Sequence, residues 1–275
     1  MSSARTLAPF GRRPVPVIGS ERYGAYVVIR CADLEGPQPD PGQFYMLTAA
    51  TRWGGGESER PFLPRAFSVL RATPDPAGGI ELQFLVEDVG PGTKRLCELA
   101  PGDGLLLVGP LGAGFVPPRD ERRALLVGGG VGIAPLAIWQ DALGAFGPEA
   151  PALLGFRDAA RAAGAVLVSG ARIATDDGSV GHHGLVTELL ADELERAADE
   201  LEVYACGPPP MLDAVRAMCK EHGAAAQLAL ESGMACGFGA CFGCVVPTRA
   251  GYIRLCMEGP VLDAALLEQT ALVHT

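Results

Sequence analysis

Ala124–Pro135 reads ALLVGGGVGIAP, and this stretch decides the fold. It begins with a short, fully apolar run, which is typical of a central strand in a parallel sheet. Gly128, Gly130 and Gly132 follow at once, and Pro135 fits the first turn of a helix. The backbone of such a turn can approach a pyrophosphate, whose charge the helix N-terminus favours. The pattern predicts a nucleotide-binding turn, with a glycine-rich turn that holds no ligand as the alternative.

Downstream of this turn, apolar runs alternate with helical patterns. The alternation predicts a doubly wound parallel sheet with helices on both of its faces. The expected strands are 124–127, 152–154, 165–168 and 203–206, and the expected helices are 135–145, 187–197 and 211–222.

Upstream of the turn, short apolar segments are separated by glycine and proline turns. Residues 80–86 alternate between apolar and polar side chains, as expected for a half-buried strand. Further segments at 25–31, 43–48, 65–70 and 105–108 complete a set that is typical of a small antiparallel β-barrel. We therefore expect three parts, which are a barrel over 1–118, an α/β domain over 119–226 and a cysteine-bearing segment over 227–275.

Four cysteines lie close together near the end of the chain, at Cys236, Cys241, Cys244 and Cys256. Their C-x4-C-x2-C spacing, with a fourth cysteine later, is the plant-type pattern for a [2Fe-2S] cluster. Zinc is one alternative, although structural zinc sites normally have two C-x2-C pairs and this segment has one. Disulfides are the other alternative, which an intracellular chain disfavours.

Cys206 ends the last expected strand of the sheet and begins the sequence CGPPPM. In open α/β sheets, ligands bind at the carboxyl ends of the strands. We therefore expect Cys206 to lie beside a nicotinamide ring, the alternative being a buried cysteine before a proline turn. The remaining cysteines, Cys31, Cys97 and Cys219, are given no role.

A possible flavin-binding pattern lies on the expected strand 65–70. Side chains alternate along a strand, so Arg65 and Phe67 share one face. Arg65 could bind a pyrophosphate, Phe67 could pack on a ring, and Ser68 could reach a ring nitrogen. Gly92 and Thr93, in a glycine–proline turn, add N–H groups and a hydroxyl for phosphate. An ordinary barrel strand is the alternative for this segment.

Composition excludes several classes of protein. The chain has 275 residues, of which 48% are hydrophobic and 20% charged, so it folds rather than staying disordered. Its net charge of −10 and lack of a basic stripe argue against nucleic-acid binding. No apolar run is long enough to span a membrane. Residues 1–14 lack the apolar core of a secretion signal, so we expect a cytoplasmic protein.

Taken together, the motifs resemble those of the ferredoxin–NADP reductase superfamily. Within it, the chain is most similar to the electron-transfer subunit of the two-subunit, NAD-dependent dihydroorotate dehydrogenase, and the likeness extends over nearly the whole chain after about residue 15. The segments that carry the likeness are 41–44 (PGQF), 90–93 (GPGT), 109–115 (GPLGAGF), 177–181 (DGSVG), 206–211 (CGPPPM) and 231–244 (ESGMACGFGACFGC). Ala66 and Phe67 depart from the usual proline and aliphatic residue of that subunit.

The resemblance implies three cofactors and their residues. Those expected to bind FAD are Arg65, Phe67, Ser68, Gly92 and Thr93; those expected to line the NAD site are Gly128, Gly130, Gly132 and Cys206; the ligands of the [2Fe-2S] cluster are Cys236, Cys241, Cys244 and Cys256. The chemistry would belong to the cofactors, so no catalytic acid–base pair is expected.

The resemblance also implies a function and a partner. A catalytic subunit would oxidise dihydroorotate on FMN in pyrimidine biosynthesis, and electrons would pass through the [2Fe-2S] cluster and FAD to NAD⁺. The two subunits would form a heterotetramer. Asp158 beside Arg157 modestly favours NAD over NADP. A related NAD(P)H–ferredoxin oxidoreductase, transhydrogenase or hydrogenase diaphorase subunit is the alternative.

Overall fold

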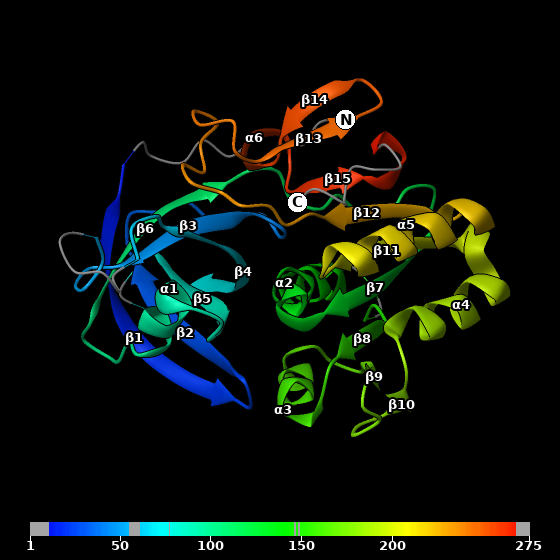
Figure 1. Ribbon diagram of the computed structural model, residues 1–275, viewed down its shortest axis with the longest axis horizontal. Helices are drawn as coiled ribbons and strands as arrows, with labels where there is room; N and C mark the ends of the chain where they lie inside the picture. The colour runs from blue at the N-terminus through cyan, green and yellow to red at the C-terminus, as the bar shows by residue number, and fades with distance from the viewer. Residues whose placement is uncertain (1–10, 55–60, 77, 146, 148, 268–275) are drawn as a thin grey trace.

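The computed structural model describes residues 11–54, 61–76, 78–145, 147 and 149–267, and in it a barrel lies beside a sheet (Figure 1). Six antiparallel strands close the barrel in the order β1-β2-β5-β4-β3-β6. This confirms the predicted antiparallel barrel. The strands are β1 (Arg13–Tyr23), β2 (Tyr26–Asp33), β3 (Phe44–Ala49), β4 (Arg65–Pro74), β5 (Ile80–Glu87) and β6 (Gly104–Leu111), with helix α1 (Pro91–Cys97) between β5 and β6.

Seven strands form the sheet, in the order β10-β9-β8-β7-β11-β12-β15. Every neighbouring pair is parallel except β12 with β15. The predicted doubly wound sheet is therefore confirmed, with an antiparallel strand added at one edge. Its strands are β7 (Arg123–Gly129), β8 (Ala152–Phe156), β9 (Arg172–Thr175), β10 (His182–His183), β11 (Leu201–Cys206), β12 (Ala225–Ala229) and β15 (Val261–Asp263).

The helices cover both faces of this sheet because β7 is apolar on both sides. Leu125 and Val127 pack with residues of α4 (Val186–Ala197) and α5 (Pro209–His222). Leu126, which points the other way, packs with residues of α2 (Ile133–Gly144) and α3 (Ala159–Ala162). Figure 1 shows α2 between the barrel and the sheet.

One predicted strand is wrong. Residues 165–168 do not form a strand, because Ala163–Leu167 is a short 3-10 helix, η2, and the strand that follows is β9. Ala162, Ala165 and Val168 are buried while Val166 is 72% exposed. Buried positions three residues apart match the three-residue turn of a 3-10 helix. An apolar run without alternation does not distinguish this arrangement from a buried strand.

The segment after α5 first adds strand β12 to the sheet and then leaves the sheet. β12 spans Ala225–Ala229, so the proposed boundary between 226 and 227 falls within this strand. The chain then forms the cysteine loop, the hairpin β13 (Val245–Thr248) and β14 (Gly251–Arg254), and the short helix α6 (Leu255–Glu258). It returns to the sheet edge through β15 and η4 (Ala264–Leu266).

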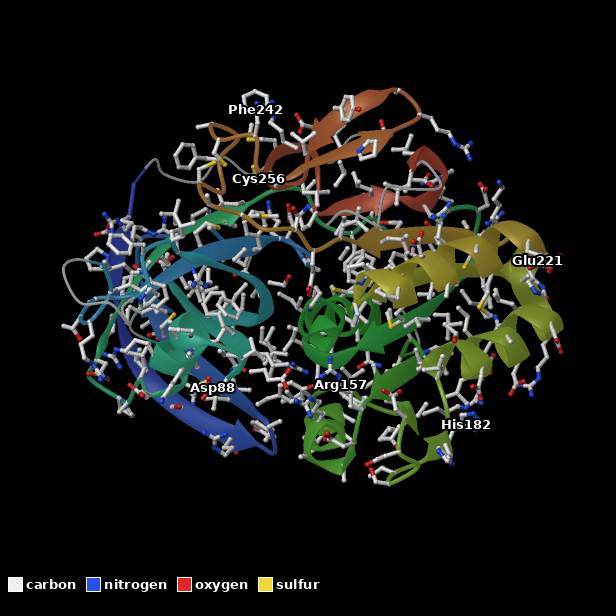
Figure 2. The ribbon with its side chains drawn as sticks, in the orientation of Figure 1. Asp88, Arg157, His182, Glu221, Phe242 and Cys256 are labelled. Carbon is white, nitrogen blue, oxygen red and sulfur yellow. The ribbon has the colours of Figure 1, made fainter. Side chains whose placement is uncertain are left out.

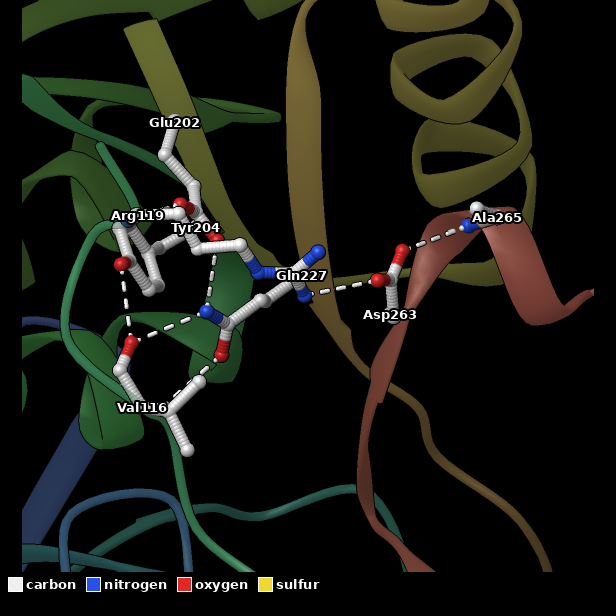
Figure 3. Close-up of polar contacts among 7 residues, drawn as sticks. All are labelled: Val116, Arg119, Glu202, Tyr204, Gln227, Asp263 and Ala265. Atoms are coloured by element: carbon white, nitrogen blue, oxygen red, sulfur yellow. Dashed lines mark hydrogen bonds and ion pairs between the residues drawn. The ribbon is translucent and has the colours of Figure 1, made fainter. Parts of the chain in front are cut away.

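A polar network fastens the linker between barrel and sheet (Figure 3). The carbonyl of Val116 accepts hydrogen bonds from Tyr204 Oη and Gln227 Nε2, each at 2.9 Å. Gln227 also donates to the buried Glu202 at 2.8 Å, and Glu202 accepts from the backbone N–H of Arg119 at 2.8 Å. The linker is thereby held against β11 and β12.

No helix among the described residues is long and apolar enough to cross a membrane. The interpretation of residues 1–14 as lacking a secretion signal falls mainly on positions 1–10, which lie outside the described residues.

Candidate functional site

A cavity of about 300 Å³ lies between the barrel and the sheet, and we call it the barrel cavity. Arg65, Phe67, Ser68 and Thr93 line it from the barrel side. Across the cavity stand residues of the η1 (Gly130–Gly132)–α2 segment, the end of β11 and the segment after β12. These are Val131, Ala134, Pro135, Cys206, Leu230, Glu231, Ser232 and Met234. The structure thus brings four of the five predicted flavin residues into one cavity.

The fifth predicted flavin residue, Gly92, is buried and acts through Arg65. A Cβ atom at Gly92 would lie 2.9 Å from Arg65 Nε, so a side chain there would displace the guanidinium. Arg65 also donates to the carbonyl of Leu63 at 2.6 Å and lies 5.9 Å from the Trp53 ring centroid. Gly92 therefore lets the Arg65 guanidinium pack against the first turn of α1.

The Thr93 hydroxyl is held by its own turn. It accepts hydrogen bonds from the N–H groups of Val89 at 2.9 Å and Gly90 at 3.0 Å, and it donates to the Gly90 carbonyl at 3.0 Å. The hydroxyl proton is therefore already used. The N–H groups in the first turn of a helix have no partner within the helix, so they remain open to other acceptors.

A second cavity, of about 490 Å³, lies at the carboxyl ends of the parallel strands, and we call it the sheet pocket. Gly129, Gly130 and Arg157 line it, together with the start of α5. Figure 2 shows Arg157 on the side of the sheet that faces the barrel. The two cavities share four lining residues, which are Glu87, Val89, Val131 and Glu231. They therefore meet along one wall.

The three predicted nucleotide glycines have different surroundings. Gly130 lines the sheet pocket and has φ +56°, and a Cβ atom there would meet Tyr26 Oη at 4.0 Å, an ordinary contact. A Cβ atom at Gly128 would lie 2.8 Å from Leu154 Cδ2, and one at Gly132 would overlap the carbonyl of Cys206. Gly128 and Gly132 thus allow close packing of strands and loop, and neither lines the pocket.

Cys206 is buried and lines the barrel cavity rather than the sheet pocket. Burial, together with the negative charge of Glu231, raises the pKa of its thiol well above the usual value. The thiol therefore stays protonated near neutral pH and forms an uncharged part of the wall.

Glu231 follows the carboxyl end of β12 and lines both cavities. Its side chain is open to the cavities, yet the surrounding protein raises the pKa of its carboxyl by desolvation. No motif in the sequence marks Glu231 as a site residue. A signal was present, because the residue follows a strand that ends beside the glycine turn.

Arg161, another residue of the sheet pocket, is neutralised by two carboxylates. It forms ion pairs with Glu87 at 2.7 Å and with Asp158 at 2.6 Å. Asp158 also caps α3 by accepting from the Arg161 backbone N–H at 3.0 Å. The remaining cation in the pocket lining is Arg157.

The four clustered cysteines come together as two pairs. Cys236 accepts hydrogen bonds from the N–H groups of Cys241 and Ala240. The thiols of Cys244 and Cys256 interact, and the Cys256 N–H lies 3.5 Å from Cys244 Sγ. Within the described ranges, no three Cys, His, Asp or Glu side chains converge closely enough for a single metal ion. Two pairs of thiols suit two irons better than one zinc ion.

The loop favours a thiolate at its first cysteine. Desolvation acts to raise the pKa of Cys236, but backbone N–H groups from Cys241, Phe238 and Ala240 outweigh it and lower the pKa to about 6. Two glycines give these groups room, since Gly237 and Gly239 have φ +79° and +84°. A loop that turns its N–H groups towards sulfur stabilises negative charge there.

Comparison with known proteins gives consistent results. A family model described as the iron–sulfur cluster binding domain of dihydroorotate dehydrogenase B matches residues 231–268. A protein of Caldanaerobacter subterraneus, named dihydroorotate dehydrogenase B (NAD(+)), electron transfer subunit, is 34% identical over 90% of this chain and 95% of its own length. A protein of the same name from Geobacillus thermodenitrificans is 35% identical over 92% of this chain and 97% of its own length.

Solved structures share the fold. That of an NADH-dependent reduced ferredoxin–NADP oxidoreductase aligns with a TM-score of 0.77 and 24% identity, covering 96% of this chain and 93% of that chain. A ferredoxin NADP⁺ reductase from Neisseria gonorrhoeae, solved with FAD and NADP, aligns with a TM-score of 0.59 and 18% identity over 77% and 92% of the two chains.

Proposed function

The chain belongs to the family of electron-transfer subunits of dihydroorotate dehydrogenase B, and from this premise we propose that it carries electrons from a catalytic subunit to NAD⁺. The observation that carries the proposal is the continuity of three sites. Met234 lines the barrel cavity two residues before Cys236, and Glu231 lines both the barrel cavity and the sheet pocket. The cysteine loop thus begins next to the lining of the barrel cavity, and the barrel cavity adjoins the sheet pocket.

Each site fits one redox group. The barrel cavity, with Arg65, Phe67, Ser68 and Thr93, would hold FAD; the sheet pocket, with Gly130 and Arg157, would hold NAD; the cysteines Cys236, Cys241, Cys244 and Cys256 would hold a [2Fe-2S] cluster. When bound, the cluster would transfer single electrons, the flavin would transfer one or two, and NAD⁺ would accept a hydride. In our proposal, the parts 1–118, 119–226 and 227–275 correspond to these three groups in turn.

The residues of the chain position and insulate these groups. The Arg65 guanidinium would supply positive charge for a pyrophosphate, and it has room because Gly92 has no side chain. Cys206 contributes a protonated, apolar wall, and Glu231 can hold a proton on its carboxyl at the junction of the two cavities. The Arg161 cation is already paired twice, which favours NAD over NADP.

The partner docks, in our proposal, on the exposed end of the cysteine loop. Cys241 is exposed, and Phe238 and Phe242 beside it are 43% and 64% exposed. Figure 2 shows Phe242 and Cys256 together at one end of the molecule. Exposed aromatic side chains are enriched at protein interfaces. The family name implies a catalytic subunit, and we propose that it contains FMN and joins this chain in a cytoplasmic heterotetramer.

Cofactor analysis of the purified protein tests this function. We expect iron, acid-labile sulfide and flavin in a ratio of about 2:2:1, with visible absorption from both groups. A colourless, folded protein with stoichiometric zinc would contradict it.

A further inference from the structure

A third cavity, of about 360 Å³, lies at the amino ends of strands β7 and β12, whereas the sheet pocket lies at the carboxyl ends of the parallel strands. Ala225 and Ala226, the first residues of β12, line it, together with the C-terminal end of α5, the linker before β7 and the segment from β15 to η4. No lining residue is shared with the barrel cavity or the sheet pocket. A molecule bound there would therefore leave the electron-transfer sites free.

Positive charge is concentrated in this cavity, which we call the basic cavity. Its charged lining residues are Arg119, Arg122, Arg216, Lys220, Arg249 and Asp263. Five cations thus face a single carboxylate, in a chain whose net charge is −10. Such a local excess of cations attracts anions and raises their local concentration.

Two of the cations are held in place by neighbours. Arg119 pairs with Asp263 at 2.7 Å, and its backbone N–H donates to the buried Glu202 (Figure 3). Arg216 pairs with Asp213 at 3.1 Å. The single carboxylate of the lining is therefore already bonded to Arg119, and these contacts fix one wall of the basic cavity.

Three cations remain available for a ligand. Arg122, Lys220 and Arg249 make no side-chain hydrogen bond or ion pair with any residue that the structure describes. Small residues form the rest of the lining, at Cys219, Gly223, Ala224, Ala225, Ala226, Ala264 and Ala265. Such side chains keep the space open while adding no competing charge.

We propose that the basic cavity binds a small phosphorylated metabolite through its phosphoryl groups. The volume falls in the range of small-molecule sites, which is about 300–1,000 Å³. Arg and Lys are the side chains that recognise phosphoryl oxygens by charge-assisted hydrogen bonds. Because the cations line a concave space, a compact anion fits them better than the surface of an acidic protein.

Calorimetric titration of the cofactor-loaded protein with inorganic pyrophosphate tests this proposal. We expect saturable binding that persists in excess NAD⁺. Arg249→Gln and Lys220→Gln should each weaken the binding about threefold or more, and the triple variant with Arg122→Gln about tenfold or more. Arg172→Gln, which removes an exposed cation of the Arg172–Glu193 pair at 2.7 Å, should leave it unchanged.

Three results would overturn the proposal. They are the absence of saturable binding, competition by NAD⁺, and equal weakening by Arg172→Gln and the cavity variants. Because the side chains of Lys220 and Arg249 are exposed, loss of folding is not expected to confuse these measurements, and thermal unfolding of each variant checks this point.

Discussion

Glu231 is one of two carboxyl groups that line both the barrel cavity and the sheet pocket, and the other, Glu87, is ion-paired with Arg161. Desolvation raises the pKa of Glu231, so the folded protein keeps a larger protonated fraction at neutral pH than a solvated glutamate would have. A proton held at this junction is available where a flavin and a nicotinamide would meet. We therefore expect Glu231, whose carboxyl can hold this proton, to assist hydride exchange.

Glu231→Gln should lower kcat for NADH-dependent dye reduction about tenfold, with a smaller change in KM for NADH. The wild-type rate should fall as pH rises through the raised pKa of Glu231, because the proton is then lost, whereas the variant should lack this decline. Stopped-flow and steady-state rates across pH measure both effects. An unchanged kcat and pH profile in the variant would rule out this role.

Asp158 is the second residue with a specific expectation, because it neutralises Arg161 at the edge of the sheet pocket. Asp158→Asn keeps an N-cap side chain on α3 but removes one of the two charges that pair with Arg161. The ratio of kcat/KM for NADPH to that for NADH should rise about threefold to tenfold. No shift in this ratio would show that Arg161 does not face the cofactor's ribose.

At this scale, sequence motifs located the right region but not each contact. Gly128, Gly130 and Gly132 share one motif, yet Gly130 is the one that lines the sheet pocket. Gly128 and Gly132 are required instead by close contacts with a side chain of β8 and with the backbone of β11, and both strands are distant in sequence. Cys206 lines the barrel cavity and not the sheet pocket, and this too depends on how the barrel packs against the sheet.

In the strand–turn–helix element around η1, one glycine is needed for packing and another lines the sheet pocket. A methyl group at Gly132 would overlap the Cys206 carbonyl. At Gly130 a methyl group would make only an ordinary contact with Tyr26 Oη at 4.0 Å, and the φ of +56° is one that an L-residue can adopt at a cost of about 1 kcal/mol. Gly132→Ala should therefore destabilise the fold by about 2–4 kcal/mol, and Gly130→Ala by about 1 kcal/mol.

Thermal unfolding and NADH titration of the two variants check this contrast. Gly130→Ala should lose affinity for NADH while keeping most of its stability, because its new methyl group enters the sheet pocket. If Gly132→Ala instead unfolds at the wild-type temperature, the close packing of η1 on β11 is not needed for stability.

Other elements show where local patterns are ambiguous. β1 was not predicted, because Pro14 and Pro16 interrupt a run in which Arg13, Val15 and Val17 are buried. Prolines disfavour most strands but are tolerated where their missing N–H faces away from a ladder. The apolar run at 165–168 predicts a strand where η2 forms, because a short apolar run without alternation fits a buried strand and a buried helical turn equally well. The long central strands and helices, whose patterns are strong, were predicted close to their observed bounds.

For the whole molecule, the sequence predicted which parts exist, and the structure added how they meet. The apolar patterns were sufficient to predict the barrel and the sheet, and the cysteine spacing and the order of the motifs were sufficient to predict the family. The barrel is joined to the sheet through the linker network around Val116 and through the packing of Phe115, Trp139 and Tyr204. Such contacts join residues far apart in sequence, and a single sequence does not reveal them.

Partner binding is a property of the complete molecule, and it can be tested at Phe242, an exposed aromatic residue of the cysteine loop. Phe242→Asp should weaken association with the catalytic subunit about tenfold or more, because it places a charge in an apolar contact. Val166→Asp is the matched control, since Val166 is 72% exposed on η2, away from the loop. Calorimetry with the purified partner gives both affinities. Equal affinities for the two variants would move the docking surface elsewhere.

The most direct test of the electron path is dihydroorotate-dependent reduction of NAD⁺ by the reconstituted two-subunit complex. Cys241→Ser should abolish this reaction while leaving part of the NADH-dependent dye reduction, because the barrel cavity and the sheet pocket do not include Cys241. Cys97→Ser, at a half-buried cysteine outside the loop, should keep both activities. If Cys241→Ser reduces NAD⁺ with dihydroorotate at the wild-type rate, electrons do not pass through the cysteine loop and the proposed order of transfer is wrong.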